Sequence, residues 1–134
     1  MFNVFDVAGT GMSAQTLRLN TTASNMANAD SVSGNAEDAY RARHPQFQAM
    51  MGRFGDAESV GVSVPYIVRS DAPAEMRYQP EHPEADGDGF VYGSNVNPIE
   101  EMVNMLSASR AYQNNIEVVT TTRDLMQRTL QMGQ

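Results

Sequence analysis

Apolar positions recur at helical spacing throughout residues 97–134. Asn97 can cap a helix with its side-chain oxygen, and Pro98 suits the first helical position because its missing N–H would be unpaired there anyway. No further Pro or Gly follows until Gly133, which is placed to end the helix. The pattern predicts a helix of roughly 36 residues, about 54 Å long at 1.5 Å per residue. Such a rod exceeds the diameter of a 134-residue globule, so something else must cover it.

Two apolar stripes run along this predicted helix. The main stripe follows the 3/4 spacing of a coiled-coil seam and is broken only at Ser109 and Arg123. Its apolar members are Met102, Met105, Tyr112, Ile116, Val119, Met126 and Leu130. The second stripe repeats every seven residues and consists of Ala111, Val118, Leu125 and Met132. Val103 and Leu106 widen the apolar surface further, and one partner helix would not bury all of these side chains.

A second heptad pattern near the start of the chain predicts a helix over residues 4–29. Its large apolar members, seven residues apart, are Phe5, Met12, Leu19 and Met26. Between them lie the small or short Gly9, Thr16 and Ala23, where another backbone can come close. Gly9 and Gly11 each cost about 1 kcal/mol inside a helix, so we expect the first turns to fray in the isolated chain. The two patterns alone fit an ordinary intramolecular antiparallel hairpin.

The middle of the chain has the periodicity of strands. Valines alternate in GVSVPYIVRS (61–70), where Pro65 predicts an edge position or a bulge. Further short strands are expected at 40–42, 47–51, 75–78 and 90–92, with turn signals between them that include Gly52 and Gly55-Asp56. The supply of aliphatic residues is thin, so we expect a small β-rich unit that leans on the helices or on a neighbour.

The predicted fold class is therefore α+β. The long N- and C-terminal helices are expected to pair as an antiparallel coiled-coil-like hairpin, with the small β-rich unit inserted between them. The predicted boundaries are 1–30 for the N-terminal helix, 31–96 for the β-rich unit and 97–134 for the C-terminal helix.

Charge and composition exclude several classes of protein. The net charge is −7, and residues 31–96 hold ten of the sixteen acidic residues, which leaves no basic face for nucleic acid. No run of about 18 apolar residues is available to insert into a bilayer. Without cysteine, neither a disulfide nor a thiolate metal site can form. The N-terminal segment lacks the features of a cleaved secretion signal, which favours the cytoplasm unless export reads no cleaved signal.

Candidate metal chemistry is weak. The stretch from Asp86 to Gly89 begins like a calcium loop, but Phe90 stands at the fifth position and Asn97 at the twelfth. His44 and His82 each precede a proline and have no helical i, i+4 partner, so a zinc site or a catalytic triad is not expected. We expect no metal, no cofactor and no catalytic residue.

Two stretches resemble the signature segments of a known family. Residues 13–31, SAQTLRLNTTASNMANADS, carry Ser13-Ala14, Leu19-Asn20 and Asn25-Met26-Ala27-Asn28 at the spacings of the flagellar rod and hook protein family. Residues 100–134 are similar to the C-terminal helix of the same family. The resemblance covers both helices and is looser across residues 32–96.

This resemblance implies a structural role in the bacterial flagellar basal body. The paired helices would form radial spokes around a central channel, with the β-rich unit outside, and would meet neighbours through heterologous, helically repeating contacts. The chain would be a subunit of the proximal rod in the periplasm, within the drive shaft that transmits torque from motor to hook. Implied partners are copies of itself, other proximal- and distal-rod subunits, a rod-to-ring adaptor and the flagellar type III export apparatus.

A set of residues is expected at the helix-pairing and assembly contacts. They are Phe5, Met12, Leu19, Asn25, Met26, Asn28, Met102, Met105, Leu106, Tyr112, Ile116, Val118, Val119, Leu125, Met126 and Leu130. Asn25 and Asn28 are expected to form hydrogen bonds where the chain leaves the first helix. Leu19 and Ile116 are expected to pack within the hairpin, and Val118 is expected to face a neighbouring subunit.

Two other functions stay open at this point. A peptidoglycan-cleaving hydrolase would draw a carboxylate pair from the acidic residues Glu81, Glu84, Asp86 and Asp88, but nothing apolar beside them would raise the pKa of one member. A generic four-helix bundle, stable as a soluble dimer, is the other alternative. The structural, non-enzymatic rod subunit is the preferred hypothesis.

Overall fold

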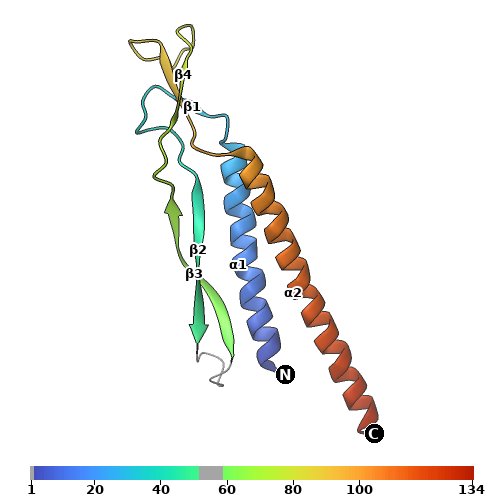
Figure 1. Cartoon of the computed structure of the whole chain (residues 1–134). Helices are drawn as coiled ribbons and strands as arrows, with labels where there is room; N and C mark the ends of the chain where they lie inside the picture. Colours follow the sequence, from blue (N-terminus) through green and yellow to red (C-terminus); the bar gives the residue numbers. More distant parts are fainter. Residues whose placement is uncertain (1, 52–58) are drawn as a thin grey trace.

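A computed structural model of the chain, which describes residues 2–51 and 59–134, has two long helices and two small antiparallel sheets (Figure 1). Helix α1 (Phe2–Ala27) and helix α2 (Pro98–Met132) lie side by side and run in opposite directions, so both termini are at the same end of the molecule. The predicted α+β class is confirmed. The helices diverge toward the termini, and the turn signals at Gly52 and Gly55-Asp56 lie outside the described residues.

Helix α2 begins and ends where its capping residues predict. The side-chain oxygen of Asn97 accepts hydrogen bonds from the backbone N–H groups of Ile99 (3.1 Å) and Glu100 (3.4 Å). These bonds satisfy N–H groups that have no partner within the helix. At the other end, the N–H of Gly133 donates to the carbonyl of Thr129 at 3.1 Å. The predicted long helix is therefore confirmed, with an observed length of 35 residues.

A two-stranded ribbon lies along α1. It consists of β2 (Arg43–Met51) and β3 (Val60–Arg69), which pair antiparallel, and both strands contact α1. Phe47 on β2 stands opposite two residues on β3, Val64 and Pro65, so the ladder has a bulge there. Proline has no N–H to donate, which makes a bulge a favourable place for it. The bulge predicted at Pro65 is confirmed.

A three-stranded sheet forms the end of the molecule away from the termini (Figure 1). Its order is β1 (Val32–Ser33), β5 (Phe90–Gly93) and β4 (Glu75–Tyr78), and both pairings are antiparallel. The strands at 75–78 and 90–93 agree with prediction, whereas β1 was not predicted. The strand predicted at 40–42 is wrong: Tyr40–Ala42 is irregular, because its backbone groups bond to Asn95 and Ser70 instead of to a ladder.

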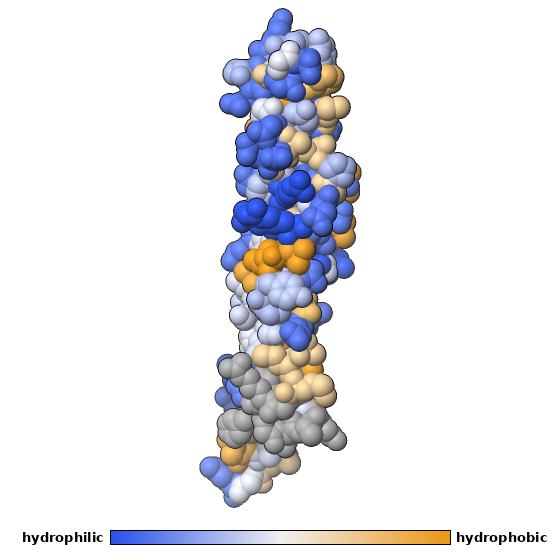
Figure 2. Space-filling model, turned by 90° about the vertical axis from the view of Figure 1, so that its left-hand side faces the viewer, coloured by the Kyte–Doolittle hydropathy of each residue, from blue (hydrophilic) through white to orange (hydrophobic). Residues whose placement is uncertain are grey.

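The interior of the described chain is thin. Its buried apolar residues are Ala8, Ala14, Ala39, Ala42, Val91 and Ala108. The accessible surface is 9021 Å², whereas a globular monomer of 14.7 kDa is expected to expose about 6,900 Å². The molecule is correspondingly long and narrow, and apolar side chains are scattered along its surface (Figure 2). Much apolar surface is therefore left for contacts with other chains.

Candidate assembly surfaces

The seam between α1 and α2 is built from small and polar side chains. Ala108 of α2 is fully buried, and Arg18 of α1 donates hydrogen bonds to Asn104 (3.3 Å) and Ser107 (3.5 Å). A Cβ at Gly11 would lie 3.0 Å from the amide nitrogen of Asn115, so the glycine lets that side chain approach α1. Small side chains allow the closest approach of two helices, and the helix contact therefore centres on them.

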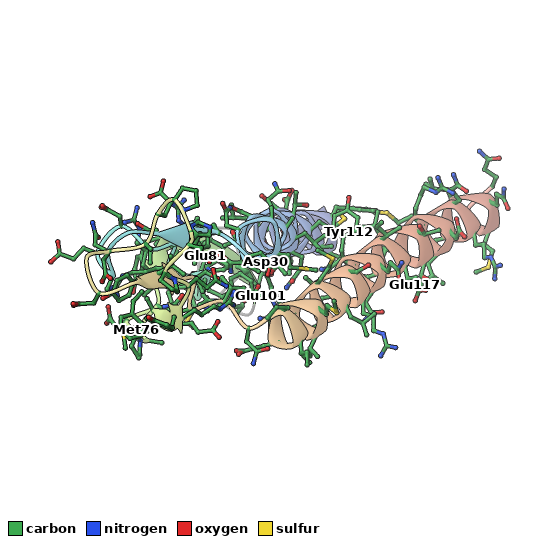
Figure 3. The ribbon with its side chains drawn as sticks, turned by 90° about the horizontal axis from the view of Figure 1, so that it is seen from above. Asp30, Met76, Glu81, Glu101, Tyr112 and Glu117 are labelled. Atoms are coloured by element: carbon green, nitrogen blue, oxygen red, sulfur yellow. The ribbon has the colours of Figure 1, made fainter. Side chains whose placement is uncertain are left out.

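Glu101 is the most unusual member of the seam. Its side chain is only 2% exposed, and Figure 3 shows it between the end of α1 and the start of α2. It occupies the first turn of α2, where the positive end of the helix dipole stabilises a carboxylate. Its Oε2 has no hydrogen-bond partner in the described part of the chain. This residue was not among the candidates from the sequence, since glutamates near a helix start, here Glu100 and Glu101, are an ordinary capping signal.

The predicted main stripe of α2 lies along the edge of this seam. Its half-buried members are Met105, Tyr112, Val119 and Met126, and its exposed members are Met102, Ile116 and Leu130. Tyr112 lies on the side of α2 that faces α1, and Glu117 lies on the opposite side (Figure 3). The predicted α1 positions Phe5, Met12, Leu19 and Met26 are all half-buried. Leu19 is thus less exposed than Ile116, which is 43% exposed.

Large apolar side chains are exposed on more than one side of α2; we call this set the outer face. It consists of Ile99, Met102, Val103, Leu106, Ile116, Val118, Leu125, Leu130 and Met132. Helix α2 has 35 residues and α1 has 26, so α2 is longer by about 13 Å at 1.5 Å per residue. Its last turns extend beyond the start of α1 (Figure 1). Exposed apolar side chains in this number indicate surface that is available for interaction.

Asn25 joins the end of α1 to the start of β2. It is fully buried, its Oδ1 accepts hydrogen bonds from the Tyr40 hydroxyl (2.9 Å) and the Arg43 N–H (3.0 Å), and its Nδ2 donates to the Arg43 carbonyl (2.8 Å). Asn28 donates to the carbonyl of Ser24 at 2.8 Å in the turn that follows α1. The prediction that both asparagines form hydrogen bonds at this exit is confirmed.

Asn95, which lies just before α2, forms a similar set of hydrogen bonds to distant parts of the chain. Its Oδ1 accepts from the Ala42 N–H (2.6 Å), and its Nδ2 donates to the carbonyls of Ala72 (2.8 Å) and Ser70 (3.3 Å). The neighbouring Ser94 donates to the carbonyl of Ala29 at 2.6 Å. We call Asn25 and Asn95 the asparagine clamp. Sequence reasoning missed Asn95, because an asparagine in a loop carries no spacing signal.

The acidic residues near the sheet serve the local fold. Asp86 Oδ1 accepts from the N–H groups of Asp88 (3.0 Å) and Phe90 (2.9 Å), so it organises its own loop. No group of three or more His, Asp or Glu side chains in the described ranges is arranged to hold a metal ion. On β4, Arg77 lies 2.7 Å from Glu75, and its hydrogen bond and positive charge lower the pKa of that carboxyl.

Comparisons with known proteins agree with these surfaces. Residues 5–34 match the family model described as flagella basal body rod protein, and residues 88–132 match that of the flagellar basal body rod FlgEFG protein C-terminal. The matched segments include most of α1 and all of α2. No helix in residues 2–51 or 59–134 has the length and apolar content to cross a membrane.

Comparison with full-length relatives shows to which family of rod proteins the chain belongs. The chain is 48% identical to the flagellar basal-body rod protein FlgC of Yersinia enterocolitica and 46% identical to that of Salmonella typhimurium, in each case over 100% of this chain and 98% of the relative. It is 36% identical to FlgC of Aquifex aeolicus, over 98% of this chain and 96% of the relative. The chain belongs to the FlgC family of flagellar basal-body rod proteins. It is a structural subunit of the basal-body rod, where it assembles with other rod components.

Proposed function

We propose that this subunit polymerises helically in the proximal rod, in the periplasm, and there transmits torque from the motor toward the hook. The observation that carries the proposal is the set of large apolar side chains exposed on α2, the outer face, because the chain's own buried apolar residues are almost all alanine. Torque must pass between subunits through packed contacts, and α2 offers the largest apolar surface for them.

The helix pair supplies the rod core in this proposal. Residues 1–30 and 97–134 would form a coiled-coil-like pair through the seam, and residues 31–96 would lie outside as the β-rich unit. The chain exposes about 2,100 Å² more than a globule of its mass. A standard interface buries about 800 Å² on each partner. The excess therefore suffices for more than one neighbour, as a heterologous helical assembly requires.

The partners follow from the same arrangement. We propose that the outer face of α2 meets copies of this chain and other proximal- and distal-rod subunits, and that a rod-to-ring adaptor contacts the same assembly. The thin interior also fits export in an unfolded state by the flagellar type III apparatus, because a chain with a small core resists unfolding weakly. The assembly residues proposed from the sequence keep that role here.

Val118 provides the direct test of the outer face. It is 46% exposed in the single chain, so Val118→Asp should leave a soluble, exportable subunit. In the rod the same change would bury an unpaired charge at every subunit, at a cost of roughly several kcal/mol each. Export is measured in the culture medium or periplasm, and incorporation is measured in isolated basal bodies. Normal incorporation of Val118→Asp would overturn the proposal.

A matched control separates charge from position. Thr120 is exposed on the same helix but is not a member of the apolar outer face. Thr120→Asp introduces the same charge on a polar position and should incorporate much better than Val118→Asp. Equal loss for the two variants would show that any added charge on α2 is harmful and would remove the special role of the outer face.

The hydrolase alternative has no support from the relatives, which are rod structural proteins. Glu81 and Glu84 are both exposed. An assay for cleavage of peptidoglycan by the purified chain should show no turnover. Turnover that disappears in Glu81→Gln or Glu84→Gln would contradict the structural role.

A further inference from the structure

Two arginines face each other at one end of the β2–β3 ribbon. Arg43 and Arg69 are partners in the antiparallel register, and both are exposed. Like charges placed directly opposite each other destabilise a pair of strands. Arg41 lies close by and donates to the carbonyl of Ser70 at 3.5 Å. Three of the nine basic residues of the chain therefore gather at a single place.

These arginines line a groove of about 240 Å³ together with Tyr40, Glu37 and Asp38, which we call the arginine groove. Figure 2 shows strongly hydrophilic side chains gathered midway along this ribbon face, beside an apolar patch. The guanidinium of Arg43 lies over the ring of Tyr40, 5.9 Å from its centre, which holds it in place.

The groove holds three arginines and two acidic residues, Glu37 and Asp38, so its net charge is positive. No ion pair there involves Arg41, Arg43 or Arg69, since the ion pairs in residues 2–51 and 59–134 are Arg77–Glu75 and Arg123–Asp124. Asp38, which lines the groove, accepts a hydrogen bond from Asn35 at 2.7 Å and is committed to a local turn. The guanidinium fork matches the geometry of a carboxylate, so the groove fits an acidic partner.

The same chain exposes a complementary surface, the loop of residues 79–89. Glu81, Glu84 and Asp88 are exposed on it, and no ion pair of the described residues involves them. The loop is held in shape by hydrogen bonds: His82 N–H to the Gln79 carbonyl at 3.0 Å, and the Asp86 side chain to the two N–H groups noted above. It lies at the end of the molecule away from the termini (Figure 1).

We propose that the acidic loop of one copy of this chain docks into the arginine groove of the next copy. The groove and the loop are different surfaces, so the contact is heterologous and can repeat from copy to copy along a helical polymer. The inference rests on the proposed function in that it requires copies to be neighbours in the rod. Apolar side chains flank both surfaces, with Ile67 exposed beside the groove and Met76 and Tyr78 exposed beside the loop.

Proximity of the two surfaces is tested by crosslinking. The chain has no cysteine, so introduced thiols are the only ones that react. Gly87 has no atom within 4 Å of the place a Cβ would take, and Ile67 is exposed on the strand face of Arg69. Gly87→Cys and Ile67→Cys in one chain should give copy-to-copy products with a bismaleimide in isolated basal bodies, whereas each single variant should give few.

Charge reversal then tests the chemistry in this cysteine background. Arg43→Glu with Arg69→Glu should lower the crosslink yield roughly tenfold or more. Glu81→Arg with Glu84→Arg should do the same. The chain that carries all four changes should regain most of the yield, because the ion pairs are restored with their signs exchanged. Failure of the combined chain to recover, while it is present in basal bodies, would overturn the proposal.

A neutral substitution separates docking from folding. Arg69→Gln removes the like-charge pair and keeps the contact between Arg43 and Tyr40, so the isolated chain should melt no lower than the unaltered one. Its crosslink yield should nevertheless fall. Arg77→Gln is the matched control, since Arg77 is already paired with Glu75, and its yield should not change. An unchanged yield for Arg69→Gln would contradict the docking.

The outcomes distinguish this inference from the proposed function. Basal bodies that contain the chain but give no copy-to-copy product would overturn the docking and leave the rod role intact. A product with a different protein at these positions would also overturn it, because the occupant would then not be a second copy. Absence of the chain from basal bodies would instead contradict the proposed function.

Discussion

The helix pair and the junction beside the sheets are held together in different ways. The junction is fixed by the asparagine clamp, in which two side chains make six hydrogen bonds to β2, the chain before it and the loop after β3. The helix pair meets through alanines, a glycine and a few polar contacts, and α2 keeps a long apolar face exposed. The junction is complete within one chain, whereas the helix pair requires neighbours to bury its surface.

The largest effect on the isolated chain is expected at the clamp. Asn25→Ala removes three hydrogen bonds and leaves the backbone N–H and carbonyl of Arg43 without these partners, which should lower the free energy of unfolding by about 2–4 kcal/mol. Urea denaturation of the purified chain measures this loss. In cells, Ala at both Asn25 and Asn28 should reduce motility without abolishing export. Normal motility of that double variant would show that the exit angle of α1 does not matter.

A smaller effect on stability is expected for Gly11→Ala at the seam, and its size depends on the neighbouring Asn115. Gly11→Ala adds a Cβ that would lie 3.0 Å from the Asn115 amide, so that side chain must move. Alanine is better than glycine inside a helix by about 1 kcal/mol. In the presence of Asn115→Ala, Gly11→Ala should therefore stabilise the chain, and in the unaltered chain it should gain less. A double-mutant cycle on melting curves gives the difference, and equal gains would show that Asn115 does not limit the approach.

The smallest effect is expected at the exposed pair on β4. Arg77 lowers the pKa of Glu75 in the folded chain, so the pair stabilises the fold above the ordinary glutamate pKa and loses this contribution as the pH falls through the lowered value. Both side chains are exposed, so the gain is screened by solvent. Arg77→Ala should return the pKa of Glu75 toward its ordinary range in an NMR titration, with little change in melting temperature. A large fall in melting temperature would contradict the small contribution to stability that is expected of an exposed ion pair.

Local chemistry explains which parts of the fold were predictable from the sequence. The bounds of α2 follow from Asn97, Pro98 and Gly133, and the bulge follows from Pro65, because each of these residues acts on its own backbone. The irregular segment 40–42 was predicted as a strand because its partner, the side chain of Asn95, is 53 residues from Ala42. Periodicity in a sequence carries no information about such a distant side chain.

The assembly surfaces were predictable only in part. The sequence indicates that α2 has more apolar surface than one partner can cover, and the exposed outer face agrees with that. The prediction centred the helix contact on large apolar side chains, because these dominate a heptad pattern. In the structure the contact centres instead on small residues, Ala108 of α2 and Gly11 of α1. The facing of Arg43 and Arg69 depends on the ribbon register beyond the bulge, which the sequence does not specify.

The central claim is that the junction is stable in the isolated chain, whereas the helix ends need neighbouring subunits. Amide hydrogen exchange, measured on the isolated chain and on the assembled rod, tests this claim most directly. In the isolated chain, the amide of Arg43 should be protected, while amides in the first turns of α1 and the last turns of α2 should exchange rapidly. In assembled rods, the amides of both helix ends should become protected. Equal, strong protection of the junction and of both helix ends in the isolated chain would contradict the account.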